Sequence, residues 1–326
     1  MIDIDFVIPW VNDSDPLWQA AYSSYSDQED KRYNKSGERF RDWGLLRFFF
    51  RSLEKYAPWV RTVHFITCGH YPEWLDINHP KLNFVKHADY IPQEYLPTFC
   101  ANTIELNLHR IKELSEHFVY FNDDMFLAAP TLPSDFFMNG LPRDLGLRNY
   151  IGLYEQGHVE LNNVNLINKN LGFHDSYKKN IWKWYNYRYG LQAARNIFFI
   201  RYKDFTGAKI THLPAPFLKS SFFEVWDACG DALHETSLRK FRNIADVNQW
   251  LIKEWQLVNG HFFPQNMRYG RYMLANEVDT ISRVLTKQRY KTICVNDCDW
   301  KDISRLKNEL QAVFSTAFPE KSSFEL

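Results

Sequence analysis

Two carboxylates and an amide stand side by side after an apolar run in the middle of the chain. The run His117–Phe121 leads directly into Asn122, Asp123 and Asp124. Carboxylate and amide oxygens are ligands that Mg²⁺ and Mn²⁺ accept, and a metal held there can neutralise charge on a nucleotide diphosphate. The same residue types also favour turns and caps, so spacing alone leaves a metal site and a plain turn as alternatives.

A second acidic segment follows the first apolar run of the chain. Asp5–Val11 has the composition of a short strand, and Asn12, Asp13 and Asp15 come soon after it. In a doubly wound sheet this loop would contact a nucleotide or complete the active site. Asx turns use the same residues, and for this loop taken alone that structural role is the simpler alternative.

A third segment, Cys294–Cys298, repeats the arrangement of a strand followed by Asn and Asp. Its two cysteines have no His or Cys partner at the spacing of a zinc site, so thiol ligation is not expected. Asn296 and Asp297 are the better candidates, as oxygen ligands for Mg²⁺ or Mn²⁺.

Basic side chains suited to phosphate oxygens occur in two places. Arg39, Arg41 and Arg47 surround Asp42 before and within a predicted helix, and an arginine fork can bind phosphate through two hydrogen bonds. Farther along, Arg242 ends a short basic cluster that could stabilise charge on a transferring phosphoryl group. For each of these side chains a solvated helix face is the alternative.

A single histidine, His212, stands beside rigid prolines in Thr211–Pro216. A positioned imidazole could remove the proton from an acceptor hydroxyl, which is general-base work near neutral pH. A lone histidine is more often structural, so this role also depends on what the fold places next to it.

Strands that alternate with helices must position these groups. The pattern predicts an α/β fold that is Rossmann-like (GT-A-like), with a mainly parallel sheet flanked by helices and a ligand crevice at the carboxyl ends of its strands. Strands are expected at Asp5–Val11, Thr62–Thr67, Leu82–Lys86, His117–Phe121 and Tyr290–Val295, and helices at Trp43–Tyr56, Ala101–Leu114, Phe217–Cys229, Asp246–Val258 and Asp302–Phe314.

Residues 140–204 interrupt this alternation and are rich in Asn and aromatic side chains. They are predicted to form an inserted helical subdomain, while residues 1–139 and 205–326 form the α/β catalytic domain. The polar segment 23–38 lacks periodicity and suits a mobile loop that could act as a lid.

The bulk composition limits the compartment and the partners. Lys plus Arg and Asp plus Glu both number 39, so no global field attracts nucleic acid. The five cysteines contain no C-x-x-C pair, and no apolar window is long enough to span a bilayer. A cytoplasmic protein of unknown oligomeric state is therefore expected, and peripheral association with the inner face of the membrane remains open.

Several stretches resemble the Stealth proteins, which include the catalytic subunit of N-acetylglucosamine-1-phosphotransferase. IDFVIPWVNDSDPLW is similar to their first conserved region, and RFRDWGLLRFFFRSLEKYAPWVRTVHFIT with IELNLHRIKELSEHFVYFNDDMFLAAPTLPSDFF is similar to the second. HLPAPFLKS with KFRNIADVNQWLIKEW resembles the third region, and ICVNDCD with AFPEKSSFEL resembles the fourth. The four stretches stand in the family's order, and residues 140–210 lie outside them.

The resemblance implies that a hexose-1-phosphate passes from a nucleotide sugar, UDP-linked or similarly activated, to a glycan hydroxyl with Mg²⁺ or Mn²⁺. The product would be a phosphodiester in capsular or exopolysaccharide, and a peripheral association with capsule assembly machinery stays open. One departure is Trp43-Gly44-Leu45, where many members carry a polar, acidic stretch. Expected roles are catalysis by Asp42, Asp124, His212 and Arg242, substrate binding by Trp10, Asn12, Asp13, Asp15, Arg39, Arg47 and Asn122, and metal binding by Asp123, Asp124, Asn296 and Asp297.

Two other functions fit parts of the same pattern. A metal-dependent GT-A-type glycosyltransferase would use a similar acidic motif, but it would attack the anomeric carbon and release UDP. A non-catalytic polysaccharide-binding protein would stack sugars on the aromatic side chains of Trp182–Tyr189. The donor sugar, the acceptor glycan, the linkage and the choice between single transfer and polymerisation are not fixed by the sequence.

Overall fold

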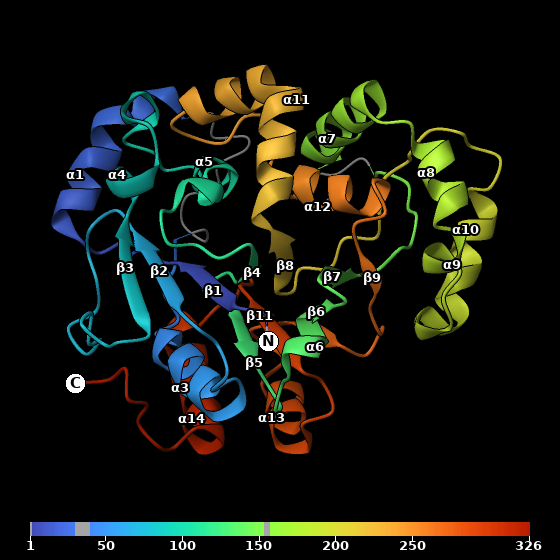
Figure 1. Cartoon of the computed structure of the whole chain (residues 1–326). Helices are drawn as coiled ribbons and strands as arrows, with labels where there is room; N and C mark the ends of the chain where they lie inside the picture. Colours follow the sequence, from blue (N-terminus) through green and yellow to red (C-terminus); the bar gives the residue numbers. More distant parts are fainter. Residues whose placement is uncertain (1, 30–39, 153–156) are drawn as a thin grey trace.

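A five-stranded sheet forms the centre of the molecule in the computed structural model, which describes residues 2–29, 40–152 and 157–326 (Figure 1). Its order is β3-β2-β1-β4-β8, in which β1 to β4 are parallel and β8 is antiparallel to β4. The prediction of a Rossmann-like α/β fold with a mainly parallel sheet is confirmed. The strands are β1 Ile4–Pro9, β2 Val63–Thr67, β3 Leu82–Lys86, β4 His117–Tyr120 and β8 Ala215–Leu218.

Helices cover both faces of this sheet, which explains why its strands are apolar on both sides. In β1 the side chains of Phe6 and Ile8 belong to one core cluster, and Val7 between them belongs to the other. The first cluster lies under α3 Leu46–Tyr56 and α14 Ile303–Ala317, and the second under α5 Ala101–Leu106, α11 Lys219–Leu238 and α12 Gln249–Val258 (Figure 1).

A second sheet continues directly from the end of β4. Its order is β10-β11-β5, with β10 parallel and β5 antiparallel to β11. Strand β5 begins at Met125, one residue after the predicted Asn-Asp-Asp site, so the two sheets meet there. The elements are β5 Met125–Leu127, β10 Gly270–Leu274, α13 Val278–Lys287 and β11 Thr292–Asn296.

Most of the predicted insert is helical, but its first residues are not. Leu141–Asp144 forms β7, which pairs with β6 Phe137–Met138 and β9 Phe263–Pro264. Pro142 and Asp144 are buried, whereas Leu141 and Arg143 are only partly buried, so burial alternates as in a strand. The prediction of a helical insert did not include this strand. The helical part contains α7 Gly157–Asn170, α8 Phe173–Lys179, α9 Ile181–Trp184, η4 Tyr187–Ala194 and α10 Arg195–Phe198. The boundaries proposed for a separate subdomain remain a prediction.

The turn expected at residues 12–15 is present, and a helix follows it that extends into the polar segment predicted as a loop. Asp15 accepts a hydrogen bond from the backbone N–H of Trp18 and Pro16 opens α1 Pro16–Tyr25, which η1 Ser26–Gln28 follows. These are ordinary N-terminal helix signals that an interpretation as a loop overlooked. The predicted lid lies mainly in residues 30–38, outside the described part of the chain. Shorter elements are α4 His87–Tyr90, η2 Gln93–Tyr95, η3 Leu108–Arg110 and α6 Pro133–Phe136.

Other predicted boundaries shift by a few residues. The helix expected at Ala101–Leu114 ends at Leu106 and is followed by one 3-10 turn, because Asn107 leaves helical dihedrals. Among the described residues, no helix combines the length and apolar character that crossing a bilayer would require.

A buried carboxylate ties the beginnings of three strands together, far from the predicted site. Asp5 on β1 is inaccessible to solvent and accepts hydrogen bonds from the Arg61 guanidinium (Nε to Oδ1, 2.8 Å) and from the Ser115 backbone N–H (2.8 Å). His64 Nε2 lies 3.1 Å from the same carboxylate. Burial opposes ionisation of Asp5, but these hydrogen bonds outweigh it and lower its pKa to about 2.

Replacing this carboxylate should destabilise the protein in a pH-dependent way. Asp5→Asn is expected to lower the free energy of unfolding by about 2–3 kcal/mol at pH 7. Because the folded-state pKa lies below the ordinary 3.8, the contribution is present above about pH 4 and is lost as the pH falls towards 2. Urea unfolding at several pH values measures it, with the exposed Asp27→Asn as control. Equal stability of both variants at pH 7 would contradict the assignment.

Candidate active site

Strand register brings the predicted site segments to one place. Strands β1 and β4 are parallel, so Trp10 and Asn122, which follow them, leave the same edge of the sheet. Strand β8 is antiparallel to β4 and pairs Ala215 with Tyr120, so the segment before β8, which contains His212, begins at that edge. The backbone N–H of Val295 on β11 donates to the carbonyl of Asp124 (2.8 Å), which brings the C-terminal segment there too.

A cleft of about 570 Å³ lies at this edge, within the size range of small-molecule sites. Segments from many distant parts of the sequence line it together. Of the predicted residues, those that line the cleft are Trp10, Asn122, Asp123, Asp124, His212, Arg242, Asn296 and Asp297.

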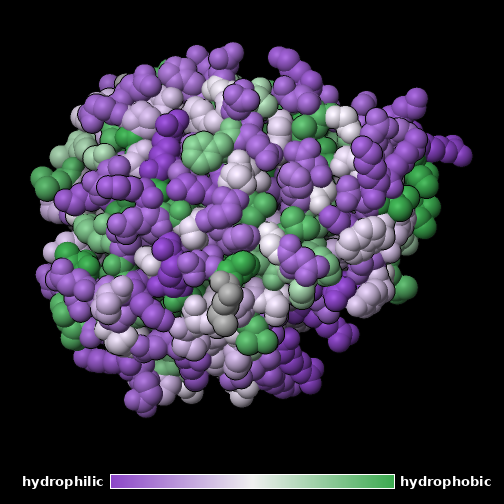
Figure 2. Space-filling model, in the orientation of Figure 1, coloured by the Kyte–Doolittle hydropathy of each residue, from purple (hydrophilic) through white to green (hydrophobic). Residues whose placement is uncertain are grey.

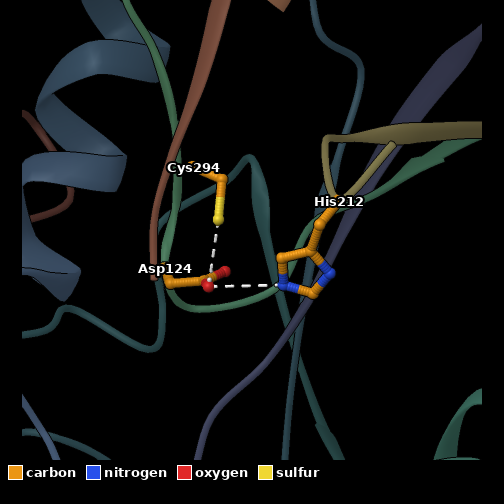
Figure 3. Close-up of side chains that lie close together, drawn as sticks. All are labelled: Asp124, His212 and Cys294. Carbon is orange, nitrogen blue, oxygen red and sulfur yellow. Dashed lines mark hydrogen bonds and ion pairs between the residues drawn. The ribbon is translucent and has the colours of Figure 1, made fainter. Parts of the chain in front are cut away.

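Asp124 is the centre of the closest cluster in this cleft. His212 Nε2 lies 3.4 Å from Asp124 Oδ2, and the thiol of Cys294 donates to the same oxygen at 3.1 Å (Figure 3). The amide nitrogen of Asn122 is 3.3 Å from His212 Nε2. The other carboxylate oxygen of Asp124, Oδ1, is buried and has no hydrogen-bond partner within the described residues.

The cleft concentrates negative charge that a cation would neutralise. Burial, then the charges of Asp124 and Asp42, raise the pKa of Asp123 to about 7. Burial disfavours the charged form of His212, but the hydrogen bond and the charge of Asp124 raise its pKa above the ordinary value. The Asp124 carboxylate therefore polarises the imidazole of His212, and it lies close to a second carboxylate, that of Asp123.

Oxygen, nitrogen and sulfur atoms at this point of the cleft could hold a divalent cation. Asp124, His212 and Cys294 offer ligand atoms within 4.8 Å of one another. Burial and the charge of Asp124 raise the pKa of the Cys294 thiol far above its usual range, so it stays protonated and donates to Asp124. The unsatisfied Asp124 Oδ1 and the neighbouring Asp123 instead supply oxygen ligands of the type that Mg²⁺ and Mn²⁺ take.

The structure also shows contacts that the sequence patterns did not indicate, and it adds Glu105 to the candidate site. Arg41, one of the arginines expected to bind phosphate, donates to Asp297 (2.8 Å) in the acidic loop after β11. Glu105 on α5 lines the cleft and accepts a hydrogen bond from the Tyr120 hydroxyl (2.9 Å). Burial raises the pKa of Glu105 to about 7. Only the tertiary structure reveals that Arg41 contacts Asp297 and that Glu105 contacts Tyr120, because neither pair lies within one sequence motif.

Other predicted residues lie outside the cleft lining. Asp42 and Arg47 line a neighbouring cavity of about 340 Å³, where Arg47 lies over the Trp74 ring, although the charge of Asp42 still reaches Asp123. Asp15 caps α1, and Asp13 accepts a hydrogen bond from the Ser14 hydroxyl. The side-chain oxygen of Asn12 accepts from the Ser14 backbone N–H, Trp43 and Leu45 are buried in the core, and Arg39 lies outside the described residues.

A second cavity, of about 330 Å³, meets the cleft at His212. Its wall includes Tyr272, whose ring meets the imidazole edge to face with centroids 6.1 Å apart. Lys209 also lines it, and no carboxylate in the described parts of the chain pairs with that ammonium group. One imidazole thus borders two separate spaces.

Comparison with known proteins supports a common origin along the whole chain. Residues 3–30 match Stealth protein CR1, conserved region 1, and residues 39–144 match Stealth protein CR2, conserved region 2. The capsular polysaccharide phosphotransferase WcwK of Streptococcus pneumoniae is 42% identical over 100% of this chain and 98% of its own. The exopolysaccharide phosphotransferase cps2G of Lactiplantibacillus plantarum is 38% identical over 99% and 96%, respectively.

A third relative and one solved structure complete the comparison. The receptor polysaccharide phosphotransferase WefC of Streptococcus oralis is 37% identical over the full length of both chains. The galactosyltransferase LgtC aligns with 95% of this chain and 96% of its own at 11% identity and a TM-score of 0.39, a likeness too weak to carry an argument. Full-length identity and two conserved regions together show that this chain belongs to the Stealth family.

Proposed function

We propose that this protein transfers a hexose-1-phosphate from a nucleotide sugar, UDP-linked in the simplest case, to a glycan hydroxyl during capsular or exopolysaccharide synthesis. The observation that carries the proposal is the convergence of Asp123, Asp124, His212, Arg242 and Asp297 on one cleft. The three full-length relatives described above are all named as phosphotransferases, which supports the same chemistry.

The proposed reaction is a substitution at the phosphorus nearer the donor sugar. The acceptor hydroxyl oxygen forms a new bond to this phosphorus, and the bond from phosphorus to the bridging oxygen of the nucleotide breaks. The nucleoside monophosphate, UMP for a UDP-sugar, leaves with the electron pair. The imidazole of His212 takes the acceptor proton at the ring nitrogen that does not face Asp124, and the charges of Arg242 and Arg41 stabilise the negative charge that spreads over the phosphoryl oxygens.

Asp123, Asp124 and Asp297 are the residues proposed to hold Mg²⁺ or Mn²⁺, with Asn296 beside them. When bound, such a cation supplies Lewis-acid stabilisation of diphosphate charge. The buried, unsatisfied Oδ1 of Asp124 supports this ligand set, as does the raised pKa of Asp123, which burial and then the charges of Asp124 and Asp42 cause.

The two spaces that meet at His212 suggest separate donor and acceptor sites. The larger cleft contains the acidic loops and Arg242, which suit a nucleotide diphosphate. The smaller cavity has Lys209 and the half-exposed ring of Tyr272 on its wall, which suit a saccharide that needs polar contacts and an aromatic face. In this arrangement the acceptor hydroxyl reaches His212 from the side opposite the donor.

Removing the ammonium group of Lys209 should weaken acceptor binding selectively. Lys209→Ala is expected to raise the KM for the acceptor about five- to tenfold, with little change in the KM for the donor, since one polar contact to the substrate is lost. Initial rates at varied concentrations of each substrate measure the two constants, with the exposed Lys301→Ala as control. An increase confined to the donor KM would reverse the assignment of the two spaces.

The identity of the released nucleotide tests the proposed reaction. The purified protein is incubated with a panel of nucleotide sugars and a glycan acceptor, with EDTA alone or followed by excess Mg²⁺ or Mn²⁺. UMP release together with a phosphodiester product, only after metal addition, is the expected result. Release of UDP with a glycosidic product would replace the proposal with a glycosyltransferase, and glycan binding without turnover would indicate a non-catalytic polysaccharide-binding protein.

A further inference from the structure

The segment from Ile181 to Tyr202 exposes apolar side chains to an unusual degree. Leu191 is 96% exposed, Phe198 81% and Tyr187 79%. Of the 19 large apolar side chains that are exposed among the described residues, eight lie in these 22 positions. The eight are Ile181, Trp182, Tyr187, Leu191, Ile197, Phe198, Ile200 and Tyr202. Such a concentration marks an interaction surface, since single exposed apolar residues are normal but clusters are not.

The same segment is strongly cationic in a chain whose net charge is zero. Residues 178–203 contain seven Lys or Arg residues and no Asp or Glu. Four of these cations, Lys178, Lys179, Arg201 and Lys203, are exposed beside the apolar side chains. The seven are Lys178, Lys179, Lys183, Arg188, Arg195, Arg201 and Lys203.

The fold presents this segment at the periphery, away from the central sheet. Helices α8, α9 and α10 form a projecting group at the right of Figure 1, and Figure 2 shows hydrophobic surface next to hydrophilic surface at that edge. Trp184, Tyr189 and Asn196 are buried. Two hydrogen bonds join the segment to Gly146 outside it: Asn196 donates to the Gly146 carbonyl, and the Tyr189 hydroxyl accepts from the Gly146 backbone N–H. The exposed side chains are therefore not needed for the segment's own packing.

We propose that residues 178–203 form a docking surface that seats the protein on an anionic lipid membrane. Apolar side chains such as Leu191 and Phe198 enter the acyl boundary, and the flanking cations contact acidic headgroups. A soluble glycan would instead need carboxylates and amides around its aromatic contacts, whereas here every charged side chain is cationic and four of the eight exposed apolar side chains are aliphatic. A second copy of the chain would bring an equally cationic surface against it, which charge repulsion disfavours.

Vesicle co-sedimentation of the full-length protein tests this surface without any need for turnover, so its failure is distinct from failure of the proposed reaction. Vesicles of phosphatidylcholine with phosphatidylglycerol are compared with phosphatidylcholine alone. The variants are Leu191→Ser with Phe198→Ser, and Arg201→Ala with Lys203→Ala. Matched controls are the exposed Leu132→Ser and the exposed pair Lys287→Ala with Lys301→Ala.

The expected result is binding to the anionic vesicles that each docking-surface variant weakens about tenfold or more, while both controls bind as the unaltered protein does. The charge contribution should also fall at high salt, because headgroup attraction is screened within about 10 Å at 0.1 M ionic strength. Circular dichroism and thermal unfolding confirm that the variants fold. Absence of binding to anionic vesicles, or equal binding by all variants, overturns the proposal. A dimer in light scattering that the same variants dissociate, without vesicle binding, assigns the surface to a second copy instead.

Discussion

Asp124→Asn should reduce turnover at least about a hundredfold while leaving the fold intact. The substitution keeps the shape of the side chain, but it removes the charge that faces His212 Nε2 at 3.4 Å and the carboxylate whose Oδ1 is otherwise unsatisfied. Both the orientation of the imidazole and the proposed metal site depend on that charge. Initial rates of UMP release measure the loss.

A second measurement separates metal binding from catalysis. Mn²⁺ is titrated into the protein, and binding is monitored by calorimetry or by the paramagnetic signal of the free ion. Asp124→Asn should bind Mn²⁺ more weakly than the unaltered protein does. Asp279→Asn, which alters an exposed carboxylate in the first turn of α13, is the matched control and should behave as the unaltered protein does. Near-full turnover and unchanged Mn²⁺ affinity in a folded Asp124→Asn variant would remove Asp124 from the site.

His212→Ala should lower kcat by about 10² to 10⁴-fold, the range of a positioned general base. The KM for the donor should change little, because the nucleotide diphosphate is assigned to the acidic loops and Arg242 in the larger cleft. The cavity left by the missing ring opens to both spaces, so added imidazole should restore part of the rate. Single-turnover rates with and without imidazole measure this rescue.

The control for this experiment is His261→Ala, which removes an exposed imidazole elsewhere on the surface and should leave the rate unchanged. A His212→Ala variant that keeps its kcat but binds the acceptor poorly would make His212 a positioning residue between the two spaces. Rescue by imidazole is the result that a positioning role does not predict.

Local pattern was sufficient for the four parallel strands of the central sheet and for most of the helices, but it did not indicate β8. The apolar run of β4, followed at once by three polar residues, identified a strand end, and Leu82–Lys86 was predicted at its observed bounds. Buried parallel strands are apolar along their length, and this signal is present in the sequence. The pattern did not indicate α1, which Asp15 caps and which extends into a polar segment. It also missed β7, which begins the segment rich in Asn and aromatic residues that was predicted to be helical.

Within the site, the sequence determined the residue types but not which of them meet. Spacing and resemblance predict site residues at Asn122–Asp124, His212 and Asn296–Asp297, and all of them line one cleft. The antiparallel pairing of β8 with β4 and of β11 with β5 decides this meeting. Sheet register is a long-range property that no local window records.

The same limit explains the residues that spacing placed incorrectly or missed. Asp13 and Asp15 follow a strand as Asp123 does, yet local hydrogen bonds at the start of α1 occupy them. Arg41 reaches Asp297 across more than two hundred residues, and the Cys294 thiol is directed at Asp124 only because β11 pairs with β5. Composition and periodicity therefore determined the strands, the helices and the available chemistry of this protein. Only the tertiary structure decided which charges share a cleft, because that depends on contacts between segments far apart in the chain.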